Sequence, residues 1–131
     1  MPALALLDKA TLRINAVVRL EDAQILFDNG RYDGAAYLCG YAVEFALKAR
    51  ICETLNTATY PDKILGFKTH QLETLLFLTG QEGHVKSNAL ADWTFVVQSW
   101  RPEMRYEAAG TVSSANVQAL LGAAKTLLNL L

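Results

Sequence analysis

Apolar residues recur at intervals of three and four along most of the chain, which is typical of amphipathic helices, and no segment alternates convincingly as a strand would. The first helix is expected from about Thr11 to Asp28. Its apolar stripe consists of Leu12, Ala16, Val18 (or Val17), Ala23 and Leu26. "DNG" at 28–30 is a strong stop signal, because Gly30 can take the left-handed conformation that ends a helix.

Four further helices are expected, separated by Gly- and Pro-containing breaks at 56–68 and 81–87 and by an irregular stretch after Pro102. They run from Asp33 to Thr54 or Leu55, from His70 to Thr79, from Asn88 to Trp100, and onward from a cap at Ser113 or Ser114. Asp33 and Thr69 are the expected N-caps of the first two of these. The 131 residues therefore predict one all-α domain over 1–131, an up-and-down bundle of four or five helices.

The second helix carries a carboxylate inside an apolar stripe. At 100° per residue, Tyr37, Tyr41, Leu47, Lys48 and Ile51 fall within about 60° of Glu44. An exposed Glu44–Lys48 ion pair is one reading. In the other, Glu44 points inward and needs partners, which we expect among Arg105, Arg101, His70 and the Tyr hydroxyls. The opposite side holds small residues that allow another helix to approach, namely Ala35, Ala42, Ala46 and Ala49.

The composition favours a subunit interface. Hydrophobic residues make up 52% of the chain and charged residues only 19%, and a small monomer has much surface to cover. Trp93 and Trp100 are seven residues apart, so they share one helix face, which is expected to be core or dimer seam. We therefore expect a homodimer.

The net charge of -1 provides no global basic field, so DNA binding is not expected. The N-terminal "MPALALL" lacks a basic start, and no apolar run approaches the ~18 residues of a transmembrane helix, so the expected location is cytoplasmic, without a membrane. Cys39 and Cys52 would lie about 20 Å apart on one helix, too far for a disulfide, and are expected to be reduced and mostly buried.

Motifs for metal and cofactor chemistry are absent from the sequence. There is no His-Glu-x-x-His, Cys-x-x-Cys, Gly-x-Ser-x-Gly or Gly-Lys-Ser/Thr segment, so no metal site and no cofactor is expected. One segment, "GTVSS", can bind an anion at the start of the last helix, and we assign to this site Arg101, Arg105, Thr111, Ser113 and Ser114. Ordinary helix capping is the simpler reading of the same residues.

Three segments carry a resemblance to a known family. "YDGAAYLCGYAVEFALKA" resembles the second helix of HEPN domains, "KTHQLETLL" their Thr-His-x-Leu segment, and "RYE" at 105–107 the Arg-Tyr segment before their last helix. The resemblance spans roughly residues 10–130. It implies a helical bundle that commonly dimerises and that acts as a metal-independent RNase, often a toxin component, or as the partner of a minimal nucleotidyltransferase. It also implies that an acidic residue on the second helix, here Glu44, positions the arginine.

In the RNases of this family, four to six residues separate an Arg from the His that follows it. From Arg101 it would fall at 106–108 and from Arg105 at 110–112, but those positions hold other residues and no His follows His84. The expected function is therefore a non-catalytic homodimeric binding or accessory module for nucleotide, RNA or a nucleotidyltransferase chain. The alternatives are an RNase that uses Arg105 and Glu44 with a substitute base, first of all His70, and a purely structural interaction subunit. The expected polar network comprises Glu44, Lys48, His70, Arg105 and Tyr106.

Overall fold

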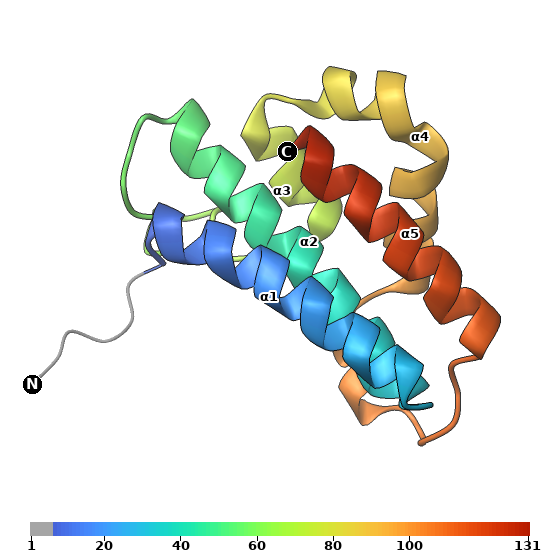
Figure 1. Ribbon diagram of the computed structural model, residues 1–131. Coiled ribbons are helices and arrows are strands. Elements are labelled where there is room, and N and C mark those ends of the chain that lie inside the picture. Colours follow the sequence, from blue (N-terminus) through green and yellow to red (C-terminus); the bar gives the residue numbers. More distant parts are fainter. Residues whose placement is uncertain (1–6) are drawn as a thin grey trace, which may run out of the picture.

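The computed structural model describes residues 7–131, apart from the side chain of Arg105, and these residues form an all-helical bundle (Figure 1). Its elements are α1 (Lys9–Asp28), α2 (Tyr32–Thr54), α3 (Leu72–Thr79), α4 (Glu82–Ser99), the short 3₁₀ helix η1 (Pro102–Tyr106) and α5 (Ser114–Leu130). The all-α prediction is confirmed. Within the described part of the chain, extended pairing is limited to one isolated bridge between Asp8 and Thr59.

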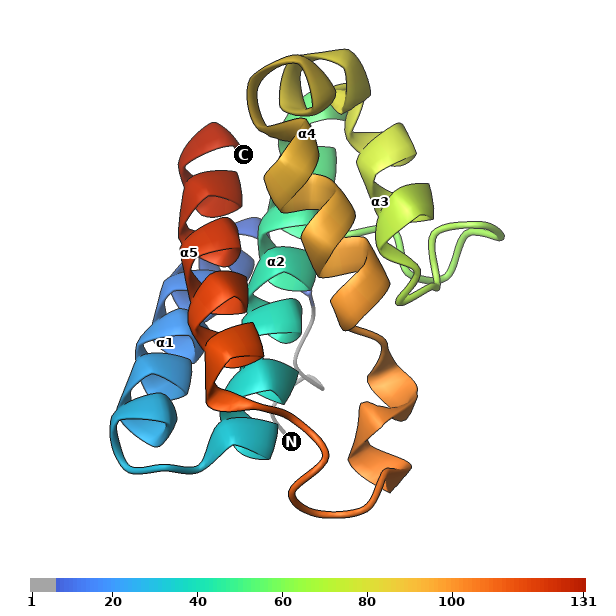
Figure 2. The ribbon, with the colours of Figure 1, turned by 90° about the vertical axis from the view of Figure 1, so that its right-hand side faces the viewer.

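Helix α2 is the centre of the bundle. It contacts α1, α3, α5 and η1 (Figures 1 and 2). The four alanines on one side of α2 are at most 1% exposed, which brings the neighbouring helices close. Gly30 has a φ of 75° and lets the chain turn back from α1 into α2, in agreement with the predicted stop signal.

Several predicted boundaries are wrong. Residues 82–87 belong to α4, and the helix is kinked instead at Ala89, inside the segment that was predicted to be helical. η1 forms in the stretch that was expected to be irregular. Asp33 lies in the first turn of α2 and is not its N-cap, because its carboxylate instead accepts hydrogen bonds from the backbone N–H groups of Gly110 and Val112, at 2.6 and 3.1 Å.

The core contains both tryptophans, so the face they share faces the interior of this chain and is not a free dimer seam. Cys39 and Cys52 are buried free thiols, as predicted. None of the helices in the described residues combines the length and apolar character needed to cross a membrane.

Candidate functional site

Glu44 is the buried centre of the site. It is 1% exposed, and the Lys48 ammonium, one turn along α2, lies 3.1 Å from its Oε2. Lys48 is itself buried, and its Nζ lies 5.3 Å from the centroid of the Tyr60 ring. Burying both charges is costly in water-free surroundings, and their close approach to each other and to the ring offsets part of that cost.

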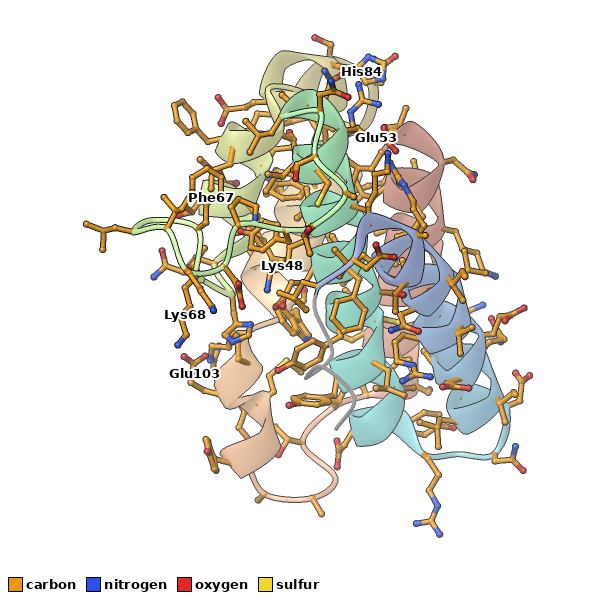
Figure 3. The ribbon with its side chains drawn as sticks, turned by 90° about the vertical axis from the view of Figure 1, so that its left-hand side faces the viewer. Lys48, Glu53, Phe67, Lys68, His84 and Glu103 are labelled. Carbon is orange, nitrogen blue, oxygen red and sulfur yellow. The ribbon has the colours of Figure 1, made fainter. Side chains whose placement is uncertain are left out.

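The loop between α2 and α3 is fastened to the N-terminal end of the described chain. The backbone N–H of Tyr60 donates to Leu7 O at 2.7 Å, and that of Lys9 donates to Ala58 O at 2.8 Å. The buried Tyr60 hydroxyl donates to Phe67 O at 2.5 Å, which closes the loop on itself. Figure 3 shows Lys48 on the side of α2 that carries this loop. The loop is thereby held where its end meets Glu44.

His70 stands at that end of the loop. Its Nδ1–H donates to the Glu44 carboxylate, with both oxygens 3.0 Å away. With Nδ1 as the donor, Nε2 carries a lone pair in the neutral ring and an N–H group in the protonated ring. The side chain is 58% exposed, and Nε2 makes no hydrogen bond to the described residues. The buried carboxylate therefore orients an imidazole whose other nitrogen is available to a ligand.

An aromatic row supports the ring on its other side. Tyr41 lies edge-on to both His70 and Trp100, with centroids 6.4 and 5.2 Å apart. The indole N–H of Trp100 donates to Tyr37 O at 3.0 Å. The indole lies directly against Gly40, where an added Cβ would be 2.0 Å from two ring carbons. Any residue larger than glycine at position 40 would displace the Trp100 ring.

His70 and Trp100 line a pocket of about 640 Å³ between the start of α3, the end of α4 and η1. We call it the His70 pocket; its wall also includes Glu73, Arg101, Glu103 and Tyr106. Figure 3 shows the loop at Lys68 beside the short helix that carries Glu103. Arg101 donates to Glu107 at 2.8 Å, and Glu73 accepts from the indole N–H of Trp93 at 2.5 Å. The pocket combines an imidazole, a guanidinium, a phenol and two carboxylates.

A family model described as the HEPN domain matches residues 11–131, which is nearly the whole chain. The chain belongs to the HEPN family. Membership of this family places the chain in a superfamily of nucleotide-binding and RNase-type proteins. No curated protein and no solved structure matches the chain significantly.

The fold brings the expected polar residues of this HEPN chain together only in part. Glu44, Lys48 and His70 form one contiguous group, and Arg101 and Tyr106 line the pocket beside it. The side chain of Arg105 lies outside the described residues. Among the described side chains, the partners of Glu44 are Lys48 and His70, and His70 was one of the expected partners.

The structure does not bring the residues of the expected anion site at "GTVSS" together in one place. Arg101 and Thr111 line a smaller pocket of about 300 Å³ between α4 and α5. Ser113 is the N-cap of α5, and its hydroxyl accepts from the Asn116 N–H at 3.2 Å. Ser114 begins the helix itself. Capping, the simpler of the two readings, accounts for Ser113.

His84 was expected in a loop but lies in the first turns of α4, where it is exposed and its carbonyl accepts from the Asn88 amide at 2.7 Å. The described residues contain no group of three or more His, Cys, Asp and Glu side chains placed to hold a metal ion.

Sequence reasoning missed the Trp100–Gly40 contact and the Glu73–Trp93 hydrogen bond. A glycine in the middle of the aromatic stripe of α2 was the one available signal, because such a glycine often marks the close approach of another group.

Proposed function

We propose that this HEPN chain is a non-catalytic binding or accessory module whose ligand is a nucleotide, free or as one unit of an RNA, held in the His70 pocket. The supporting observation is the position of His70, which Glu44 fixes by two 3.0 Å approaches at the wall of this pocket. A volume of about 640 Å³ suits a small ligand, since such pockets usually enclose ~300–1,000 Å³.

Residues on the different walls of the pocket can contact different parts of a nucleotide. Arg101 and a protonated His70 are donors for phosphate oxygens. The Tyr106 ring, 77% exposed, can stack on a base, and Glu103 can accept hydrogen bonds from base amino groups. Glu73 and Glu103 repel a long polyanion, and the net charge of -1 adds no attraction. A single nucleotide unit therefore suits the pocket better than an extended RNA backbone, and an accessory role to a nucleotidyltransferase on another chain fits such a ligand.

The two histidines of the chain allow a matched test. We expect wild type to bind mononucleotides with a change in tryptophan fluorescence, because Trp100 lines the pocket. His70→Gln and Arg101→Gln should each weaken binding about tenfold or more, because a hydrogen bond to a charged group contributes roughly 1.5–3 kcal/mol. His84→Gln, which changes an exposed histidine on α4, should bind as wild type does. Equal affinities of all four proteins, or no binding by wild type, would reject the proposal.

A metal-independent RNase is the second candidate, and the Glu44–His70 contact is the observation that favours it. An imidazole oriented by a buried carboxylate can take the proton of a ribose 2′-hydroxyl while the 2′-oxygen attacks phosphorus and the bond to the 5′-oxygen breaks. The same variants decide between the candidates in an RNA cleavage assay with chelator present. The binding proposal expects no cleavage by wild type. Cleavage that His70→Gln abolishes and His84→Gln retains would establish the RNase instead.

A further inference from the structure

Two carboxylates line the His70 pocket, those of Glu73 and Glu103, and they differ in what they contact. Glu73 is paired within the protein, because its carboxylate accepts from the Trp93 indole N–H at 2.5 Å and lies 3.5 Å from the Lys86 ammonium. Glu103 is exposed and makes no hydrogen bond or ion pair to the described residues. Both oxygens of Glu103 are therefore available to a ligand.

The 3₁₀ helix η1 carries Glu103 and Tyr106 on the same side. Side chains three residues apart in such a helix are eclipsed, and a rise of ~2.0 Å per residue separates them by about 6 Å along the axis. Both residues line the His70 pocket, and the Tyr106 ring is exposed. A base that stacks on this ring therefore has its edge within reach of the Glu103 carboxylate.

The charges around the pocket determine which end of a nucleotide faces Glu103. A carboxylate repels phosphate, whereas the Arg101 guanidinium and a protonated His70 ring donate to phosphate oxygens. His70 stands in the loop before α3, and Arg101 directly precedes η1. The phosphate group is thus held at His70 and Arg101, which leaves the base to Tyr106 and Glu103.

A carboxylate selects among bases by its hydrogen-bonding pattern. It only accepts, and its two oxygens lie side by side. Guanine is the one RNA base with two neighbouring donors on its pairing edge, the N1–H and the 2-amino group. Adenine and cytosine present one amino group beside a ring-nitrogen acceptor, and uracil presents one N–H between two carbonyl groups. These three bases would bring an acceptor against a carboxylate oxygen, which is repulsive.

We infer that Glu103 makes the His70 pocket selective for guanine nucleotides, by accepting from the N1–H and the 2-amino group of a base stacked on Tyr106. The inference rests on the proposed function, since it names the class of nucleotide that the pocket takes. Glu103 is then the residue that determines specificity, whereas His70 and Arg101 bind any nucleotide through its phosphate.

The common mononucleotides and one analogue test the selectivity of wild type. Isothermal titration calorimetry with chelator present should show that GMP binds about tenfold more tightly than AMP, CMP and UMP. IMP keeps the N1–H of guanine but lacks the 2-amino group, so it should also bind about tenfold more weakly, because a hydrogen bond to a charged group contributes roughly that factor or more. Equal affinities for GMP and AMP, or for GMP and IMP, would overturn the inference and leave the proposed function standing. No binding of any nucleotide would reject the proposed function and the inference with it.

Glu103→Gln tests the residue itself. A carboxamide offers one acceptor and one donor, which complements xanthine, because xanthine carries a carbonyl oxygen where guanine has its 2-amino group. The variant should therefore bind XMP more tightly than GMP, the reverse of the wild-type order. Because Glu103 is exposed, its thermal midpoint should stay near that of wild type. Glu21→Gln, which changes an exposed carboxylate on α1 outside the pocket, should keep the preference for GMP. A Glu103→Gln protein that still prefers GMP over XMP would contradict the inference.

Free nucleotide and RNA are two sources of the same base, and a short single-stranded RNA with one guanosine distinguishes them. Weaker binding of this RNA than of GMP assigns the pocket to the free nucleotide, which is the result we expect because the carboxylates of the pocket repel a long polyanion. Tighter binding that is lost when inosine replaces the guanosine assigns the pocket to guanosine within a strand. Tighter binding that inosine leaves unchanged would count against Glu103 as the selective group.

Discussion

Glu44 and Lys48 are an ion pair removed from water, and such pairs respond sharply to the loss of one member. Replacing Glu44 by Ala leaves the Lys48 ammonium buried without its carboxylate and removes the acceptor of His70. We expect the free energy of unfolding to fall by ~3–5 kcal/mol, measured by denaturant titration.

Glu53 supplies the matched control, because its ion pairs with Arg13 and Arg50 are about one third exposed. Glu53→Ala should cost no more than ~1 kcal/mol. Similar losses in the two variants would contradict the view that burial makes the Glu44 pair different.

The sequence could indicate that Glu44 points inward, and it offered Lys48 and His70 among several candidate partners, but it could not choose between these candidates. Helical geometry places Glu44 among Tyr37, Tyr41 and Leu47, and this requires no knowledge of the tertiary fold. The bond to His70 joins residues 26 positions apart, and it depends on how the loop after α2 is fastened. Helical spacing carries no information on such a contact. Lys48 could be identified as the i,i+4 neighbour of Glu44, but the sequence spacing of such an ion pair is the same whether the pair is exposed or buried.

At the scale of the elements, one glycine determines how α2 and the end of α4 meet. A methyl group at Gly40 would overlap the Trp100 ring, so Gly40→Ala must push the indole out of its place. Overpacking of this kind usually costs ~1–3 kcal/mol, and here the displaced ring would also narrow the His70 pocket. We expect a lower thermal midpoint and a changed tryptophan emission spectrum.

Gly122→Ala is the corresponding control on α5. Its added methyl group meets no atom within 4 Å, and alanine favours a helix over glycine by ~1 kcal/mol. It should be neutral or stabilising. A Gly40→Ala protein as stable as Gly122→Ala would mean that the close contact with Trp100 is absent.

The start of α4 shows where pattern reading fails. Residues 81–87 are polar and include Gly83, so they read as a break, yet Gly83 lies inside the helix with open space around its α-carbon. The polar residues there face solvent, and only Val85 is buried. A single buried position gives too weak a periodicity to be recognised against a glycine. The kink at Ala89 lies beyond the expected break, in a stretch whose sequence predicted a regular helix.

At the scale of the whole molecule, both cysteines lie on the central helix α2, and their thiols are buried in the core. Burial raises the pKa of Cys39 to about 12 and also raises the pKa of Cys52. The thiolate is the reactive form, so at pH 8 the folded protein should react very slowly with a disulfide reagent, and both thiols should react at once in denaturant. Cys39→Ser and Cys52→Ser identify which thiol is being observed. Rapid reaction of Cys39 under native conditions would show that α2 is accessible without unfolding.

The bundle class could be predicted because it depends on repeated local signals, whereas the choice between core and interface could not. Trp93 and Trp100 share a face with Val96 or Val97 in either case. α3 covers Trp93, whose indole N–H donates to the Glu73 carboxylate. α2 covers Trp100, whose ring lies against Gly40. Large hydrophobic residues that stay exposed lie on α1, in the loop after α2, on α3 and on α4, and only the fold reveals their exposure.

The short turn between α1 and α2 also bears on the order in which the chain folds. These two helices share the most extensive packing in the molecule, and only residues 29–31 separate them, so bringing them together costs little chain entropy. The His70 pocket, in contrast, joins residues from 69 to 106 and rests on an α2 that must already be in place. We therefore expect the α1–α2 hairpin to be the folding nucleus and the pocket to be among the last parts to form.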